Sequence, residues 1–318
     1  MTPASISIPA RVPNTRLRLQ RRLRRGLALG AALVLAAGAL FFYLHPIRVI
    51  ETGIALRLRL AGVKSRYVMA EGYRIHYLEG GQGKPLLLIH GLGSRAEDWT
   101  PEIPAYIHAG FHVYAIDLLG CGRSPKPNIA YSITEQAEMV HAFLAALHLK
   151  DVDVAGWSMG GWVALKLTLL HPADVRRLVL MDAAGLLFHA PLTPATFEPR
   201  TIPQLHQLMA LLTPNPPSMP RFMERHLLHR MAANFPVVSR TVQSMLTGQD
   251  LLDGQLEQIH VPVLILWGSE DALIPPSVGA AMHAGIPGSQ FTLISGCGHL
   301  APARCWRRTT KAVLSFLQ

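Results

Sequence analysis

The segment Ala155-Gly156-Trp157-Ser158-Met159-Gly160-Gly161 lies between an apolar run, residues 151–155, and a run typical of a helix, residues 162–171. It contains the pattern G-x-S-x-G. Between a strand and a helix this pattern forms a nucleophile elbow, a sharp turn that lifts one serine hydroxyl out of the backbone. Glycines flank the serine because a Cβ there would clash with the neighbouring strand and helix. The hydroxyl lies beside a helix N-terminus, which stabilises negative charge. The sequence therefore predicts that Ser158 is a nucleophile.

A serine hydroxyl needs a base that removes its proton and an acid that orients the base. Residues 261–267 have the pattern of a buried strand, and Asp271 follows them; residues 290–295 have a strand pattern, and His299 follows them in a glycine-rich loop. Sites in open α/β sheets collect at such strand ends, and the chain order serine, acid, histidine is the one expected after this elbow. We predict a triad of Ser158, Asp271 and His299.

Other acids compete for the second position of the triad. Asp182 follows a predicted strand, residues 178–181, and is the main alternative, while Glu270 is the neighbour of Asp271. A lone aspartate after a strand is usually a turn or cap residue. Most of the 15 histidines are expected to lie on the surface or in packing roles.

The hydroxyl's reaction also requires hydrogen-bond donors for an oxyanion. Residues 85–89 have the pattern of a strand that ends in His90-Gly-Leu-Gly93, a turn that aims a backbone N–H at the site. We predict two donors, the N–H of Leu92 and that of Met159, the residue after the nucleophile. His90 is expected to brace this loop rather than to carry a proton.

These motifs together resemble the α/β-hydrolase family, from about Tyr67 to the C-terminus. The resemblance rests on His90-Gly-Leu-Gly93, Asp117-Leu-Leu-Gly-Cys-Gly-Arg-Ser124, Gly156-Trp-Ser-Met-Gly160, Gly268-Ser-Glu-Asp271 and Gly298-His299. It implies a mostly parallel eight-stranded sheet flanked by helices, with a helical cap insertion at 185–250. The loop 117–124 then shapes the pocket wall. In one departure, no acid follows Pro302 in the turn after His299, where the family often has Pro and then Glu.

A looser similarity links the layout to membrane-anchored monoacylglycerol lipases. The family resemblance implies an esterase or lipase that works through an acyl-enzyme and needs no cofactor or metal. Alternatives on the same triad are C–C bond hydrolases of the meta-cleavage type and perhydrolases. A serine at 158 excludes the alkyl-enzyme chemistry of epoxide hydrolases and dehalogenases, and Met159 argues against prolyl aminopeptidases, which usually have Trp there. A non-enzymatic binding protein usually has a damaged triad, and this one is complete.

Positive charge is concentrated before the catalytic domain. The formal net charge is +10, but 12 of the 30 Lys/Arg and one of the 20 acids lie in residues 1–66. The remaining 18 Lys/Arg and 19 acids make residues 67–318 nearly neutral. No nucleic-acid-binding motif is present, so the basic excess predicts a membrane partner rather than a nucleic acid. Nothing in the sequence indicates an oligomeric state.

The basic region surrounds an uncharged apolar span, Gly26–Leu44. As a helix it is roughly 28 Å long, about one hydrocarbon thickness. Ala37-Gly-Ala39 fits a signal-peptidase site, but the apolar run continues through Leu44, which favours an uncleaved anchor. Flanking arginines argue against a buried soluble helix. Seven arginines precede the span and four basic residues lie in the next twenty, so we expect a cytoplasmic N-terminus and an extracytoplasmic domain.

The expected organisation is a basic tail at 1–25, an anchor at 26–44, a juxtamembrane linker at 45–66 and the hydrolase domain at 67–318. Residues 47–63 form either a plain linker helix or a helix along an anionic membrane surface. The cap is rich in proline in its first half, which predicts short helices at 202–212, 221–233 and 237–246. Its Met and Leu side chains suit a lipophilic acyl group.

The three cysteines, Cys121, Cys297 and Cys305, are sparse and odd in number. They give no expectation of a disulfide framework. Cys297 is expected only to line the loop that carries His299. Nothing resembles a metal site.

Overall fold

The computed structural model describes residues 15–190 and 192–318, and its contacts divide the chain into two units, Met1–Val49 and Ile50–Gln318. In the first unit, α1 (Thr15–Leu44) contains an apolar stretch, Leu23–Leu44, with a mean hydropathy of 2.3. None of this stretch is buried against other parts of the chain. This helix is long and apolar enough to cross a membrane. The predicted basic tail lies outside the described residues up to residue 14 and is helical from Thr15 onward.

The second unit is built on an eight-stranded sheet with the strand order β1-β2-β4-β3-β5-β6-β7-β8. The pairs β1–β2 and β2–β4 are antiparallel and all the others are parallel. This confirms the predicted mostly parallel sheet. The strands are β1 (Lys64–Ala70), β2 (Tyr73–Gly81), β3 (Lys84–Ile89), β4 (Phe111–Ile116), β5 (Val152–Trp157), β6 (Val175–Met181), β7 (Val263–Gly268) and β8 (Gln290–Ile294).

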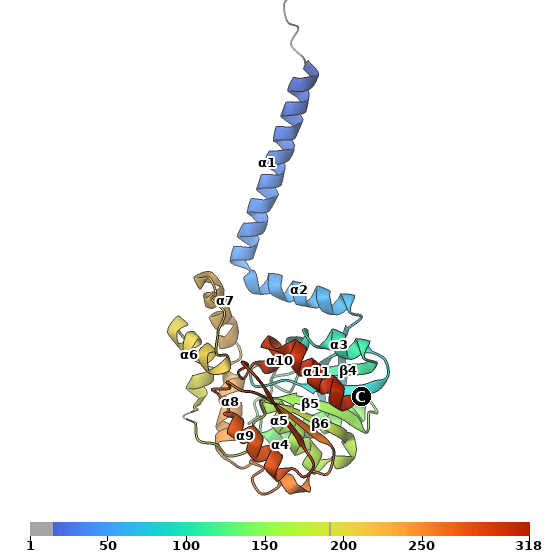
Figure 1. Ribbon diagram of the computed structural model, residues 1–318. Coiled ribbons are helices and arrows are strands. Elements are labelled where there is room, and N and C mark those ends of the chain that lie inside the picture. Colours follow the sequence, from blue (N-terminus) through green and yellow to red (C-terminus); the bar gives the residue numbers. More distant parts are fainter. Residues whose placement is uncertain (1–14, 191) are drawn as a thin grey trace, which may run out of the picture. The chain divides into compact units, whose positions relative to one another are not determined.

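Helices cover both faces of this sheet (Figure 1). One face carries α4, α5 and α9; the other carries α3, α10 and α11. The helices of the sheet region are α2 (Pro46–Leu60), α3 (Ile103–His108), α4 (Ile133–Ala146), α5 (Met159–Leu170), α9 (Pro276–Gly285), α10 (Ala301–Arg304) and α11 (Trp306–Leu317), with short 3-10 turns η1 (Ala96–Trp99), η2 (Pro172–Asp174) and η4 (Leu256–Gln258).

The central strands are buried on both faces. In β3, Leu87 and Ile89 belong to the core under α4 and α5, while Leu86 and Leu88 belong to the core under α3 and α11. Successive side chains of a strand point to opposite faces. A strand covered by helices on both sides is therefore apolar without alternation, as in the run 85–89 of the sequence.

The stretch expected to be a juxtamembrane linker, 45–66, contains the helix α2 and the first residues of β1. In its second-unit portion, Leu58 is buried at 4% exposure and joins the core next to Val63, and Ile54 packs on the same core. Leu56 and Leu60 are exposed. The helix thus has one side anchored on the domain and apolar side chains left at the surface.

The cap consists of η3 (Pro194–Phe197), α6 (Ile202–Leu212), α7 (Arg221–Ala232) and α8 (Phe235–Leu246). Prolines stand in the first turn of α6 and of α8, where the missing N–H costs nothing. The predicted cap helices agree with these bounds to within about two residues. The last helical segment is interrupted at Cys305, between α10 and α11.

Gly160 generates a prediction for stability. A Cβ on Gly160 would lie 2.3 Å from the carbonyl oxygen of Ile89 and 2.5 Å from that of His90. Backbone atoms of β3 cannot move aside cheaply, so Gly160→Ala should lower the free energy of unfolding by roughly 1–3 kcal/mol or more. The measurement is thermal unfolding of the full chain in detergent.

Gly53→Ala is the matched control. Gly53 lies in α2 with no atom within 4 Å of a Cβ, so alanine there should be neutral or stabilise by up to about 1 kcal/mol. Equal melting temperatures for the two variants would contradict the steric account of the elbow.

Candidate active site

Ser158 stands at the turn between β5 and α5 with φ 56° and ψ −121°. A positive φ is unusual for a residue with a Cβ, and backbone hydrogen bonds hold it here. The N–H of Ser158 donates to the carbonyl of Met181 at 2.9 Å, and the carbonyl of Ser158 accepts from the N–H of Ala184 at 3.1 Å. The strained turn is thereby fastened to β6 and to the segment that follows it.

The three residues predicted as a triad lie together. Nε2 of His299 is 2.8 Å from Oγ of Ser158, and Nδ1 of His299 is 2.8 Å from Oδ2 of Asp271. His299 and Asp271 are buried. The other carboxylate oxygen of Asp271 accepts two N–H bonds at 2.9 Å, from Leu273 and Ile274. In this arrangement a proton on Nδ1 is donated to Asp271, which leaves Nε2 to accept the serine proton.

The two alternative acids do not lie in this chain of hydrogen bonds. Asp182 is fully buried and accepts from the N–H of Gly268 at 2.7 Å. Burial, and next the negative charge of Asp271, raise the pKa of Asp182 well above its usual value. Glu270 is exposed, and its backbone N–H donates to the carbonyl of Cys297.

Leu92 and Met159, the predicted oxyanion donors, both line a cavity together with Ser158. In the described part of the chain neither N–H donates a hydrogen bond to another residue. His90 is fully buried; its Nε2 accepts from the N–H of Leu118 at 3.1 Å, so its Nδ1 carries the proton and donates to the carbonyl of Gly91 at 2.8 Å. His90 thus ties the oxyanion loop to the next loop, in agreement with the bracing role predicted for it.

A second hydrogen-bonded chain of serine, histidine and aspartate lies outside the predicted site. Oγ of Ser65 is 2.8 Å from Nε2 of His76, whose Nδ1 is 2.6 Å from Oδ2 of Asp117. Burial favours the neutral form of Asp117, but the hydrogen bond from His76, the nearby His90 and two backbone N–H groups together lower its pKa. Sequence reasoning treated Asp117 as part of a wall loop and missed His76, which stands in β2 without a local motif.

Two connected spaces meet at Ser158. The polar cleft, of about 490 Å³, has the cap helices on one side. It is lined by Ser158 and His299, by Leu208, Leu212, Leu227 and Val238 of the cap, and by Arg95, Arg123, Lys126 and Arg230. The apolar arm is smaller, about 190 Å³. It is lined by Ser158, Leu92 and Met159 and, among others, by Trp162, Phe188, Val242, Met245 and Leu273.

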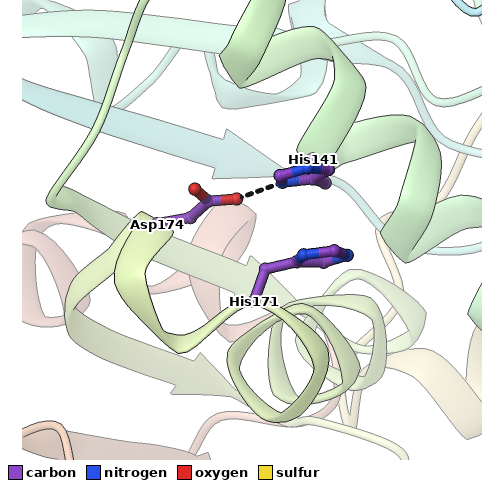
Figure 2. Close-up of side chains that lie close together, drawn as sticks. All are labelled: His141, His171 and Asp174. Carbon is purple, nitrogen blue, oxygen red and sulfur yellow. Dashed lines mark hydrogen bonds and ion pairs between the residues drawn. The ribbon is translucent and has the colours of Figure 1, made fainter.

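One cluster among the described residues has the composition of a metal site. His141, His171 and Asp174 bring one ligand atom each within 4.8 Å of the others (Figure 2). The two imidazole rings, however, stack at 3.7 Å and are parallel to within 4°. In-plane lone pairs of stacked rings do not converge on one ion. Each ring also has its own carboxylate, Asp174 for His141 and Glu138 for His171, so two histidine–carboxylate hydrogen bonds account for the cluster.

The cysteines require a correction. Cys297 and Cys305 form a disulfide, whereas the odd count led us to expect none. The pairing joins the loop that carries His299 to the break between α10 and α11, and Nη2 of Arg308 lies 2.9 Å from Sγ of Cys297. The two cysteines are eight positions apart, and the chain reverses between them in the folded structure, which brings the two sulfurs together. Cys121 is free and buried.

Comparisons with known proteins agree with this architecture. A sequence profile of the alpha/beta hydrolase fold matches residues 84–303. The chain is 31% identical over 262 residues to a 2-hydroxy-6-oxo-6-(2'-aminophenyl)hexa-2,4-dienoic acid hydrolase of Metapseudomonas resinovorans, covering 79% of this chain and 90% of that one. It is 28% identical over 270 residues to Lipase 1 of Psychrobacter immobilis, with coverages of 79% and 83%.

Among solved structures, a membrane phospholipase A, described as a bacterial virulence factor, superposes with a TM-score of 0.79 at 28% identity. The match covers 92% of this chain and 98% of that one. Lipases and a dienoic acid hydrolase thus share this scaffold, and the similarity to monoacylglycerol lipases in particular is not specifically supported.

The two neighbouring aspartates generate a prediction. Asp271→Asn should lower kcat by roughly 10⁴-fold, because an amide beside Nδ1 of His299 does not stabilise the imidazolium. Asp182→Asn should keep kcat within tenfold of wild type, because Asp182 accepts from the N–H of Gly268 and lies outside the chain of hydrogen bonds to His299. Steady-state kinetics of both variants make the measurement, and comparable losses in the two would contradict the assignment of the acid.

The same substitution tests the raised pKa. An unfolded aspartate has a pKa of about 3.9, so above that value the folded chain holds a proton on Asp182 that the unfolded chain lacks. The contribution of Asp182 to the free energy of unfolding is present at low pH and is lost as the pH rises through the pKa that Asp182 has in the folded chain. The melting temperature of Asp182→Asn relative to wild type should therefore increase as the pH rises above about 4. A difference independent of pH would argue that Asp182 ionises normally.

The disulfide between Cys297 and Cys305 generates a prediction for thermal stability. The closed loop is short, with a sequence separation of 8, and such a cross-link is worth about 2–3 kcal/mol. Reductant should lower the melting temperature of the wild-type chain accordingly. The double variant Cys297→Ser/Cys305→Ser provides the control, since reductant should leave its melting temperature unchanged. The wild-type chain is pre-incubated with reductant under denaturing conditions. A melting temperature that stays unchanged after this treatment would contradict the pairing.

Proposed function

Because this chain belongs to the α/β-hydrolase family, we propose that it is a membrane-anchored serine hydrolase that cleaves carboxylic esters of lipophilic acids through an acyl-enzyme. The observation that carries the proposal is the chain of hydrogen bonds from Ser158 through His299 to Asp271. Ser158 at its end also lines the apolar arm.

In the proposed reaction Ser158 Oγ attacks the ester carbonyl while Nε2 of His299 takes its proton. The N–H groups of Leu92 and Met159 receive the developing oxyanion. His299 then delivers the proton to the leaving alcohol, and Asp271 stabilises the imidazolium that exists between these steps. A water molecule activated by His299 attacks the acyl-enzyme and releases the acid. Every step is served by side chains and backbone groups of this chain.

The apolar arm supports a lipophilic acyl group. Val242 and Met245 of α8 and Phe188 of the preceding segment face the same space as Ser158. Burial of methylene groups there is worth about 0.8 kcal/mol each, and a thioether side chain adapts to flexible chains. The relatives named as a lipase and a phospholipase A support the same substrate class, and monoacylglycerols remain one member of it.

We further propose that α1 anchors the enzyme with its domain on the extracytoplasmic side. The uncharged stretch of α1 and the arginines before it support this orientation. The disulfide between Cys297 and Cys305 is independent support, because disulfides persist in oxidising compartments. An anchored enzyme meets its lipophilic substrate in the bilayer, and the exposed Leu56 and Leu60 of α2 are suited to the membrane surface.

A second candidate function is C–C bond hydrolysis of a meta-cleavage product on the same triad. The 31% identity to a dienoic acid hydrolase favours it. The basic side chains of the polar cleft are compatible with such an acidic substrate. The two candidates differ in the bond cleaved and in the need for a long apolar acyl group.

Substitution of the nucleophile tests the proposal. Ser158→Ala should lower kcat for long-chain esters by roughly 10⁴-fold or more while leaving the melting temperature near that of wild type. The measurement is ester hydrolysis by the full chain in mixed micelles, together with mass-spectrometric mapping of an organophosphonate probe. The probe should label Ser158.

Ser65→Ala is the matched control, because Ser65 also contacts a histidine of a His–Asp pair. It should retain activity and labelling. Activity that survives in Ser158→Ala would sink the mechanism. Ser158-dependent cleavage of a vinylogous diketo acid in preference to esters would replace the proposal with the second candidate.

A further inference from the structure

The lining of the polar cleft carries more positive than negative side chains. It contains four cationic side chains, Arg95, Arg123, Lys126 and Arg230, and one carboxylate, Asp98. Asp98 accepts from Oγ of Ser94 at 2.6 Å and from the N–H of Arg95 at 3.2 Å. The net charge of the cleft therefore depends on which of its cations have carboxylate partners.

Two further carboxylates behind the lining balance part of this charge. Glu51 pairs with Arg95 at 3.1 Å and also with Arg230. Glu97 pairs with Arg123 at 2.8 Å, and Arg123 also donates to Oγ of Ser65. Three carboxylates thus stand against four cations, and the group as a whole keeps one unbalanced positive charge.

Lys126 is the cation without a carboxylate. Among the described residues its Nζ donates to the amide oxygen of Asn234 in the cap, and no ion pair holds it. Lys126 follows the glycine loop of β4, whereas Asn234 lies between α7 and α8, so the pair spans the cleft. Lys126 is exposed, whereas burial lowers the pKa of Arg230, which lines the same cleft. An anion bound in the cleft would stabilise the positive charges of both side chains.

The direction of the substrate follows from the two spaces that meet at Ser158. With the acyl group in the apolar arm, the carbonyl lies at the serine and the alcohol part of the ester extends into the polar cleft. Lysine is a compact point charge on a flexible stem that binds phosphate well, while a neutral alcohol gains only a hydrogen bond from it and no ion pair.

We propose that the polar cleft binds a phosphate group on the alcohol side of the ester, with Lys126 as its charge partner, so that the substrates are lysophospholipids or phospholipids rather than neutral glycerides. This inference rests on the proposed ester hydrolase function. It assigns to Lys126 the selection of the leaving group, a role separate from the chemistry at Ser158.

The test compares three esters with the same long acyl chain in neutral mixed micelles: monoacylglycerol, lysophosphatidylglycerol and an acyl ester of glyceric acid. The full chain should hydrolyse the carboxylic ester of lysophosphatidylglycerol with a kcat/KM roughly tenfold or more above that for monoacylglycerol. Lys126→Met should reduce this ratio by roughly tenfold, the effect of one charge-assisted hydrogen bond. Lys126→Arg should keep most of the ratio, and added salt should weaken it.

Lys150→Met is the matched control, since Lys150 is exposed on the turn after α4, outside the cleft. It should leave the ratio unchanged. Ser158-dependent hydrolysis with the same ratio in wild type and Lys126→Met would overturn the inference and leave the proposed function standing. A stronger dependence on Lys126 for the glyceric acid ester would overturn the phosphate assignment in favour of a carboxylate. Absence of Ser158-dependent hydrolysis of all three esters would overturn the proposed function and this inference with it.

Discussion

Close packing of backbone against backbone at the elbow is the constraint on which the site depends. Ser158 has a positive φ, and Gly160 and Gly156 lie where any side chain would meet a carbonyl oxygen at 2.3 Å. β3, β5 and the start of α5 can therefore approach only if these positions are glycine. That approach brings the oxyanion loop, which follows β3, to the serine that follows β5. The chemistry of the site is a consequence of the distance between two backbones.

Electrostatics then separates two carboxyl groups that are close in space. Asp182 and Asp271 follow the adjacent strands β6 and β7, and each accepts backbone N–H bonds. Two neighbouring buried carboxylates cannot both ionise cheaply. Burial and the charge of Asp271 raise the pKa of Asp182, while Asp271 faces an imidazole. Position within the hydrogen-bond network, rather than position in the strand order, selects the acid.

Two spaces with different linings meet at the triad. The apolar arm is lined mainly by apolar side chains, whereas the lining of the polar cleft includes four cationic side chains and one carboxylate. The proposed ester hydrolysis uses both spaces, with the acyl group in the apolar arm and the alcohol part in the polar cleft.

The sequence by itself determined the sheet, the elbow, Ser158 and His299, with Asp271 as the first of three candidate acids, because local patterns carry this information. Glycines at fixed offsets, apolar runs of strand length and polar residues at strand ends act over a few residues, and the structure places Ser158, Asp271 and His299 within hydrogen-bond distance. The cap helices were predicted for the same reason, since proline marks their starts.

Only the tertiary structure decided which acid contacts His299, which cap side chains line the cleft, and that Cys297 joins Cys305. It also revealed His76 between Ser65 and Asp117, and Lys126 facing Asn234 across 108 positions of sequence. These contacts join segments whose relative placement depends on how helices pack on the sheet. Local patterns contain no record of that packing, so burial and charge balance are set only when the chain is folded.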